Sequence, residues 1–285
     1  MVKLVGLKQL LKKAQAGHYA VGAFNAANLE TIQAILRAAQ AEKSPAIVQF
    51  SEKSIRYMGA KVCYDLAKSV AEQEQVTVPL CIHLDHGQKM ETVRACLSAG
   101  FPSIMFDASK EKFADNVRHT KQAAVLARRY GASVEAELGI LRGKEDDVAS
   151  LEAKFTDPLE AKQFVSLVRP DCLATSIGTG HGYRQKIIRL DLERLKAIRK
   201  QVSIPLVLHG SSGAVESDIR KAVSLGICKI NCDTILRMAY SDALRSQLAK
   251  NPDEIDLREY SGPARDAVQS AVQQRMRLCG SSGKA

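Results

Sequence analysis

The chain has 285 residues, of which 46% are hydrophobic, so it can bury a large core as two small domains or as one barrel. No apolar run approaches the length that spans a membrane, and the N-terminus carries no apolar signal segment, so a cytoplasmic protein is expected. The net charge of +10 suits an anionic substrate, while a 5% aromatic content without tryptophan argues against a base-stacking surface for nucleic acid.

Short apolar runs alternate with amphipathic segments along the chain. The apolar runs predict eight strands, at 19–24, 46–50, 78–82, 103–106, 133–138, 172–177, 205–208 and 227–230. Helical spacing of apolar residues predicts helices at 29–41, 59–70, 90–98, 113–130, 157–168, 192–200, 215–225, 234–248 and 263–278. The charged segment 141–147 shows neither pattern and is predicted to be a long loop.

Eight strand–helix units without a linker predict one α/β domain over residues 1–285, a (β/α)₈ TIM barrel with an additional C-terminal helix. The strands are nearly continuous apolar runs, as expected when both faces of a parallel strand are buried. Active sites of such barrels lie at the carboxyl ends of the strands. The residues that follow each strand are therefore the candidates for function.

Three of the six histidines follow predicted strands, and each precedes a glycine: His86, His181 and His209. Imidazole is a common zinc ligand, and three protein ligands with one open position suit a catalytic zinc. His18 and His119 lie outside this pattern, in a loop and a helix, and are predicted at the surface. The sequence therefore predicts one zinc site built from three strand ends.

Carboxylates follow the same strands. Asp85 directly precedes His86, while Asp107 and Glu137 lie at the ends of the fourth and fifth strands and are possible alternative metal positions. His83, two residues before Asp85, is predicted to support the site or to point away from it.

Seven cysteines, an odd number with no Cys-x-x-Cys pair, indicate reduced and mostly buried thiols rather than a disulfide framework. Cys81 and Cys232 fall near the predicted site and are kept as alternative metal ligands.

Two polar runs precede predicted helices near the end of the barrel. The glycines and serines of 210–213 and the residues 231–234 follow the seventh and eighth strands. Exposed amides at helix N-termini bind phosphate, and barrels often hold a phosphate after these two strands. We therefore expect a phosphorylated small molecule as the substrate.

Several motifs together resemble the class II, zinc-dependent ketose-bisphosphate aldolases over nearly the whole chain. The matching segments are Tyr19–Asn25, His83–Gly87, Phe106–Ser109, Val134–Gly139, Glu145–Val148, Ile177–Gly182, Leu208–Gly213 and Gly226–Asn231. The resemblance implies zinc held by His86, His181 and His209. It implies that Asp85 handles the proton of the C4 hydroxyl, and that Glu145 exchanges the proton at the enediolate carbon.

The resemblance also implies where the two phosphates of the substrate bind. The segments for the C1 phosphate are Gly182, Gly210, Ser211, Ser212, Asn231, Cys232, Asp233 and Thr234, with a monovalent cation (Na⁺ or K⁺) nearby. Arg237 matches an arginine that binds the C6 phosphate, and Arg258 matches one that reaches the same phosphate across a subunit interface. Asn25 and Ser51 line the channel, and the chain is expected to form a homo-oligomer, a dimer or a tetramer.

The resemblance implies reversible cleavage of fructose 1,6-bisphosphate to dihydroxyacetone phosphate and glyceraldehyde 3-phosphate. Asp233 favours this substrate; the alternative is tagatose 1,6-bisphosphate or a related ketose phosphate. The sequence departs from the family pattern at 141–144, at 183–188 and at Ile235. These departures bear on the aldehyde half of the substrate.

Three other functions are weighed against this one. A Schiff-base aldolase would need a lysine inside the barrel, for which Lys229 is the candidate. A metal-dependent hydrolase usually needs more ligands, such as a His-x-His at the first strand, and the sequence has none there. A non-catalytic phosphosugar-binding protein would not need the intact acid and base residues.

Overall fold

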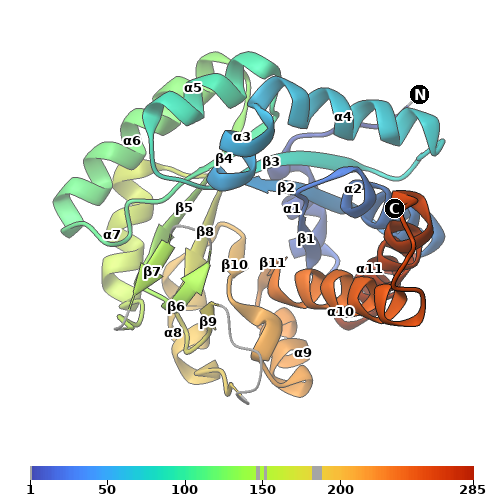
Figure 1. Cartoon of the computed structure of the whole chain (residues 1–285). Helices are drawn as coiled ribbons and strands as arrows, with labels where there is room; N and C mark the ends of the chain where they lie inside the picture. The colour runs from blue at the N-terminus through green and yellow to red at the C-terminus, as the bar shows by residue number, and fades with distance from the viewer. Residues whose placement is uncertain (1, 146–147, 151–152, 182–187) are drawn as a thin grey trace.

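A closed barrel of eight parallel strands forms the centre of the computed structural model, which describes residues 2–145, 148–150, 153–181 and 188–285 (Figure 1). In order around the barrel the strands are β1 (Val21–Asn25), β2 (Ala46–Ser51), β3 (Leu80–Gly87), β4 (Ser103–Phe106), β5 (Ser133–Leu138), β8 (Cys172–Thr175), β10 (Leu206–Leu208) and β11 (Ile227–Cys232). β11 pairs with β1 and closes the ring. The predicted TIM barrel is confirmed.

Helices surround the strands (Figure 1). They are α1 (Leu7–Ala16), α2 (Leu29–Ala41), α3 (Glu52–Met58), α4 (Ala60–Gln73), α5 (Met90–Ala99), α6 (Phe113–Arg129), α7 (Pro158–Val168), α8 (Leu192–Gln201), α9 (Glu216–Ser224), α10 (Thr234–Lys250) and α11 (Leu257–Leu278). The additional C-terminal helix is confirmed: α11 packs against α10 and α2. Buried apolar side chains fill the layer between strands and helices.

A helix absent from the sequence prediction, α1, closes one end of the barrel. Its residues Leu7, Leu10 and Leu11 pack on the side chains inside the barrel, and the amide of Lys8 donates to Ser133 at the start of β5. Because the amino ends of the strands are covered in this way, the carboxyl ends form the open mouth. The polar residues that follow the strands are therefore gathered at the one end that a substrate can reach.

Two predicted segments differ from the structure. The segment 141–147 was predicted to be a loop, but β6 (Arg142–Glu145) pairs with β7 (Val148–Ser150) and with β9 (Gly180–His181) in a small separate sheet. The pairing of β6 with β9 is a long-range contact, and the charged local sequence of β6 gives no sign of it. The last helix begins at Leu257 instead of Pro263, because Asp256 caps it by accepting a hydrogen bond from the amide of Arg258.

The remaining predictions about burial agree with the structure. All seven cysteines are buried and free, His18 is exposed, and His119 is half-buried beside Glu111 on the outside of the barrel. In the described ranges, no helix has the length and apolar character needed to cross a membrane.

Candidate active site

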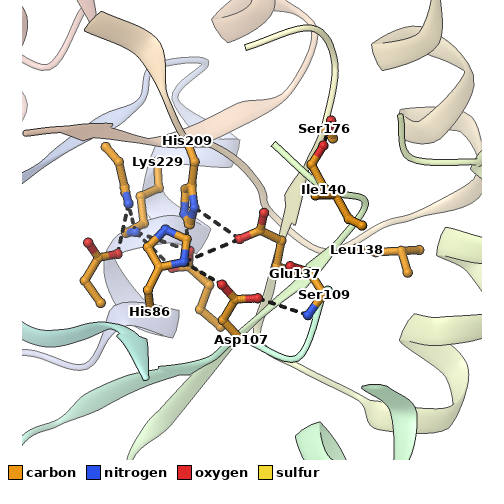
Figure 2. Close-up of polar contacts among 12 residues, drawn as sticks. His86, Asp107, Ser109, Glu137, Leu138, Ile140, Ser176, His209 and Lys229 are labelled. Atoms are coloured by element: carbon orange, nitrogen blue, oxygen red, sulfur yellow. Dashed lines mark hydrogen bonds and ion pairs between the residues drawn. The ribbon is translucent and has the colours of Figure 1, made fainter. Parts of the chain in front are cut away.

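Polar side chains that lie on seven of the barrel strands, or directly after them, meet at the mouth of the barrel and are buried there. The buried members of this group are Asn25, Gln49, Asp85, His86, Asp107, Glu135, Glu137, His209, Lys229 and Asn231. Figure 2 shows His86, His209 and Glu137 turned toward one another, with Lys229 beside them. Such a concentration of buried charge requires close pairing, because an isolated buried charge is strongly unfavourable.

Of the three predicted zinc ligands, His86 and His209 have described side chains, and these two rings face each other. The rings of His86 and His209 lie 4.7 Å apart between centroids, at 70°. His86 has a φ of 47°, a left-handed conformation that costs a residue other than glycine about 1–3 kcal/mol and is often found at functional sites. The backbone is therefore held in an unfavourable conformation where it presents this ring.

Carboxylates lie beside Nδ1 of His86 and beside both ring nitrogens of His209. Nδ1 of His86 lies 2.8 Å from Oδ2 of Asp107, and Nε2 of His209 lies 2.8 Å from Oε1 of Glu135. Nδ1 of His209 lies 3.3 Å from Oε2 of Glu137. A carboxylate on one nitrogen fixes the tautomer and orients the other nitrogen, which is the usual arrangement around histidines that bind zinc.

These contacts change the pKa values of the histidines. Burial disfavours the charged ring of His86, but the carboxylates of Asp85 and Asp107 outweigh this and hold its pKa well above the usual range. Burial likewise disfavours charged His209, yet its hydrogen bonds to Glu135 and Glu137 raise its pKa to about 9.

The charges around Glu135 act in the same way. Burial disfavours the carboxylate of Glu135, but Lys229 and His209 hold its pKa well below the usual range. His83, which contacts Ser103 through Nδ1 at 2.8 Å, has its pKa lowered to about 3 by burial and by Lys229. His83 is therefore neutral at pH 7. Its contact with Ser103 suits a supporting residue, which is one of the two roles that the sequence left open.

Asp85 is held from both sides. Its Oδ2 accepts a hydrogen bond of 2.9 Å from Nδ2 of Asn25, and its Oδ1 accepts one of 3.0 Å from Nδ2 of Asn231. Asn25 is fixed in turn because its Oδ1 accepts from Nε2 of Gln49 at 2.7 Å. Gln49 was not predicted as a site residue, although an amide inside an apolar strand is a signal that could have identified it.

Two sets of side chains have donor atoms close enough to hold one metal ion. Atoms of Asp85, His86 and His209 all lie within 4.8 Å of one another, and so do atoms of His86, Asp107 and Glu137. Imidazole and carboxylate donors fit zinc. The third predicted ligand, His181, ends β9, where its backbone pairs with Gly143; its side chain lies outside the described residues.

The segment after β10 brings backbone close to backbone. Gly210 has a φ of 60°, and a Cβ at this position would lie 2.7 Å from the carbonyl oxygen of Gly180, so only glycine fits. Ser211 begins a short 3₁₀ turn with Ser212, and its hydroxyl donates to the carbonyl of Asn231 at 2.7 Å. The two predicted phosphate segments are thus linked; Gly182 lies outside the described residues.

The second predicted phosphate region lies beside the first. A cavity of about 410 Å³ is lined by Asn25, Asp233 and Arg237 among others, and Asn25 also donates a hydrogen bond to Asp85. Asp233 precedes α10, which begins at Thr234, and its Oδ1 accepts from Nε of Arg237 at 2.7 Å.

Ser51 lies beside this centre: it is buried, it pairs with Asp85 in the register of β2 and β3, and its hydroxyl contacts that of Ser54 in α3. Two other predicted residues are not tied to the centre by any contact that is described. Arg258 is 88% exposed and pairs with Asp256 of its own helix. The backbone of Glu145 lies in β6, and its side chain is outside the described residues.

Comparison with known proteins decides the family. The family model described as fructose-bisphosphate aldolase class-II matches residues 5–284. The chain belongs to this family. The fructose-bisphosphate aldolase of Geobacillus stearothermophilus is 45% identical to this chain over 285 residues, covering 100% of this chain and 99% of that protein. A probable fructose-bisphosphate aldolase of Bacillus subtilis is 44% identical, covering 99% of both.

Solved structures of aldolases have the same fold. The YdjI aldolase of Escherichia coli K12 superposes with a TM-score of 0.85 at 34% identity, covering 99% of both chains. A putative fructose-1,6-bisphosphate aldolase of Coccidioides immitis gives a TM-score of 0.86 at 30% identity, covering 98% of this chain and 97% of the other. Membership of the class II aldolase family and the barrel therefore agree.

The raised histidine pKa values predict how this class II aldolase responds to pH when divalent metal is removed. The unfolded pKa of histidine is about 6.5, so the pairing of His209 stabilises the fold fully below that pH and is lost as pH rises through about 9. The pairing of His86 acts in the same direction. We expect the melting temperature, measured by calorimetry in the presence of chelator, to decrease as the pH rises from about 6.5 to about 9.

Replacing His209 by glutamine should flatten this decline, whereas replacing the outlying His119 by glutamine should leave it in place. A melting temperature that is constant over the same pH range in the unmodified chain would contradict the assigned pairing.

Proposed function

We propose that this protein is a zinc-dependent aldolase that reversibly cleaves fructose 1,6-bisphosphate to dihydroxyacetone phosphate and glyceraldehyde 3-phosphate. The observation that carries the proposal is the close approach of Asp85, His86 and His209 at the barrel mouth, within 4.8 Å. Relatives at 44–45% identity are named fructose-bisphosphate aldolase, which favours fructose over the tagatose alternative.

His86, His181 and His209 would hold the zinc ion. Asp107 holds Nδ1 of His86 and Glu135 holds Nε2 of His209 at 2.8 Å each, so the metal would bind Nε2 of His86 and Nδ1 of His209, the latter beside Glu137 at 3.3 Å. Asp107 and Glu137 would offer an alternative position beside His86. The chemistry that the metal supplies when bound is Lewis-acid polarisation of the substrate ketone.

Asp85 would move the proton. A carboxylate that accepts hydrogen bonds on both oxygens is held in one orientation, and here Asn25 and Asn231 provide those bonds. In cleavage, Asp85 would take the proton of the C4 hydroxyl as the C3–C4 bond breaks, and in condensation it would return that proton. Glu145 would exchange the proton at the carbon next to the ketone.

The two ends of the substrate would be bound by different means. Backbone amides would bind the C1 phosphate, with a monovalent cation beside it, at Gly182, Gly210, Ser211, Ser212, Asn231, Cys232, Asp233 and Thr234. Side-chain guanidinium groups of Arg237, and of Arg258 from a neighbouring subunit, would bind the C6 phosphate.

Replacing Arg237 by alanine should raise KM for fructose 1,6-bisphosphate by about 10- to 100-fold, since a hydrogen bond to a charged group contributes about 1.5–3 kcal/mol. Turnover of fructose 1-phosphate, which lacks the second phosphate, should not change. Arg245→Ala is the matched control, because Arg245 lies on the same helix and pairs with Asp242 at the surface. An equal loss with both substrates would contradict the assignment of Arg237.

A homo-oligomer is part of the proposal. Ile255 is 90% exposed and Leu257 is 66% exposed beside Arg258, and apolar side chains this exposed are suited to burial against a second copy. Sedimentation analysis should give a dimer or a tetramer, and Ile255→Asp should shift it toward the monomer. A monomer at micromolar concentration in the unmodified protein would contradict this part.

The substrate itself is tested by a cleavage assay. Fructose 1,6-bisphosphate should be cleaved with a higher kcat/KM than tagatose 1,6-bisphosphate or fructose 1-phosphate. A preference for the tagatose substrate would replace the proposed function by its alternative, and binding without cleavage would indicate a phosphosugar-binding protein.

A further inference from the structure

Lys229 lies among the buried charges of the site but is not one of the groups to which a direct role has been given. It belongs to β11 and is fully buried. Its Nζ lies 3.0 Å from Oε2 of Glu135 and 2.6 Å from Oδ1 of Asn231. β5 and β11 are separated in the barrel by β8 and β10, so the contact with Glu135 crosses the barrel interior.

One contact of Lys229 leads to the metal side of the site. Glu135 binds Nε2 of His209 at 2.8 Å, and a carboxylate accepts hydrogen bonds only, so this nitrogen carries the proton. The ring of His209 is thereby turned so that Nδ1 faces Glu137 and His86. Lys229 fixes the position of Glu135 and compensates its buried charge. It therefore influences the orientation of His209 indirectly, through Glu135.

The other contact leads to the proton-handling side. The amide of Asn231 has one accepting and one donating end, and it lies between an ammonium group that only donates and a carboxylate that only accepts. Its Oδ1 must therefore face Lys229, and its Nδ2 must face Asp85, at 3.0 Å. Without the ammonium group the amide oxygen would lose the donor that holds it, and only the bond to Asp85 would keep the amide in this orientation.

We propose that Lys229 is a positioning residue that orients His209 through Glu135 and Asp85 through Asn231, and so couples the metal half of the site to the proton-handling half. The roles of His209 and Asp85 in this statement rest on the proposed function. The same contacts argue against Lys229 as a Schiff-base nucleophile, because its amino group is enclosed and shared between two side chains.

The test is the variant Lys229→Met, which keeps the length of the side chain and removes its charge and its hydrogen bonds. Zinc affinity, measured by competition with a chromogenic chelator, should fall by about 10- to 100-fold, as when an outer partner of a metal ligand is removed. Turnover of fructose 1,6-bisphosphate should fall by about 100-fold, the lower end of what a positioned acid or base contributes. KM should change less than kcat, because Lys229 contacts the side chain of Asn231, whereas the C1 phosphate would be bound by its backbone amide.

Variants of the two contacts separate the effects. Glu135→Gln should weaken zinc binding, whereas Asn231→Ala should lower kcat and leave zinc affinity unchanged. Cys228→Ala is the control for a purely structural disturbance, since Cys228 is the neighbouring buried residue of β11, packs in the apolar cluster with α1 and donates from its thiol to the carbonyl of Gly226. It should lower the melting temperature without changing zinc affinity or kcat.

A folded Lys229→Met variant with normal zinc affinity and normal kcat would overturn the proposal. If that variant does not fold, the double variant Lys229→Met with Glu135→Gln removes both buried charges and should still show both defects. Should this also fail to fold, an unchanged kcat in Asn231→Ala or an unchanged zinc affinity in Glu135→Gln would overturn it. Failure of the unmodified protein to bind zinc or to cleave the substrate would instead reject the proposed function.

Discussion

Replacing Asp85 by alanine should lower kcat for cleavage of fructose 1,6-bisphosphate by about 10²- to 10⁴-fold, the contribution of a positioned acid or base. Zinc content and KM should stay close to those of the unmodified protein. Asp85 is fully buried, and two amide groups hold its oxygens in place. The carboxylate is therefore presented in one orientation.

The isosteric variant Asp85→Asn separates proton transfer from packing. It keeps the size of the side chain but cannot take a proton, so its kcat should be as low as that of the alanine variant. Asp65→Ala, which removes an exposed carboxylate of α4, is the control and should be fully active. Near-normal turnover of either Asp85 variant, measured in a coupled assay, would remove Asp85 from the mechanism.

Replacing His209 by alanine should abolish zinc binding and reduce cleavage by about 10³-fold or more, since Lewis-acid stabilisation contributes several kcal/mol and each 1.36 kcal/mol is tenfold in rate. The fold should tolerate the change, because Glu135 keeps Lys229 as a partner at 3.0 Å. Zinc content is measured by mass spectrometry of the purified protein, and activity in the same preparation.

His119→Ala provides the comparison, because it removes a histidine that lies on α6 and contacts Glu111 outside the barrel. It should leave zinc content and turnover unchanged. A His209→Ala protein that retains stoichiometric zinc and full activity would show that the metal site lies elsewhere.

Much of the fold could be predicted because a parallel barrel buries both faces of its strands. Runs such as 78–82 and 205–208 are therefore continuously apolar, and polar residues follow them. The N-terminal helix α1 was missed although Leu7, Leu10, Leu11 and Ala14 have helical spacing. The hairpin of β6 and β7 could not be predicted locally, because its partner β9 lies more than thirty residues away.

The site was only partly predictable for a related reason. His86, His209 and Asp85 follow strands, and strand ends in a barrel converge, so their proximity follows from the fold class alone. The hydrogen-bond partners of these groups do not follow from the fold class, because they depend on which side chains face each other across the barrel. The contact between Glu135 and Lys229 joins strands that are not neighbours, and only the closed barrel brings them to 3.0 Å.

The measurement that tests the central claim most directly is cleavage of fructose 1,6-bisphosphate before and after removal of divalent metal, with borohydride present in a parallel sample. We expect activity to be lost in chelator, to return on addition of zinc, and no substrate to become attached to the protein in borohydride. Activity that persists in chelator, together with a substrate adduct trapped on Lys229, would contradict the account.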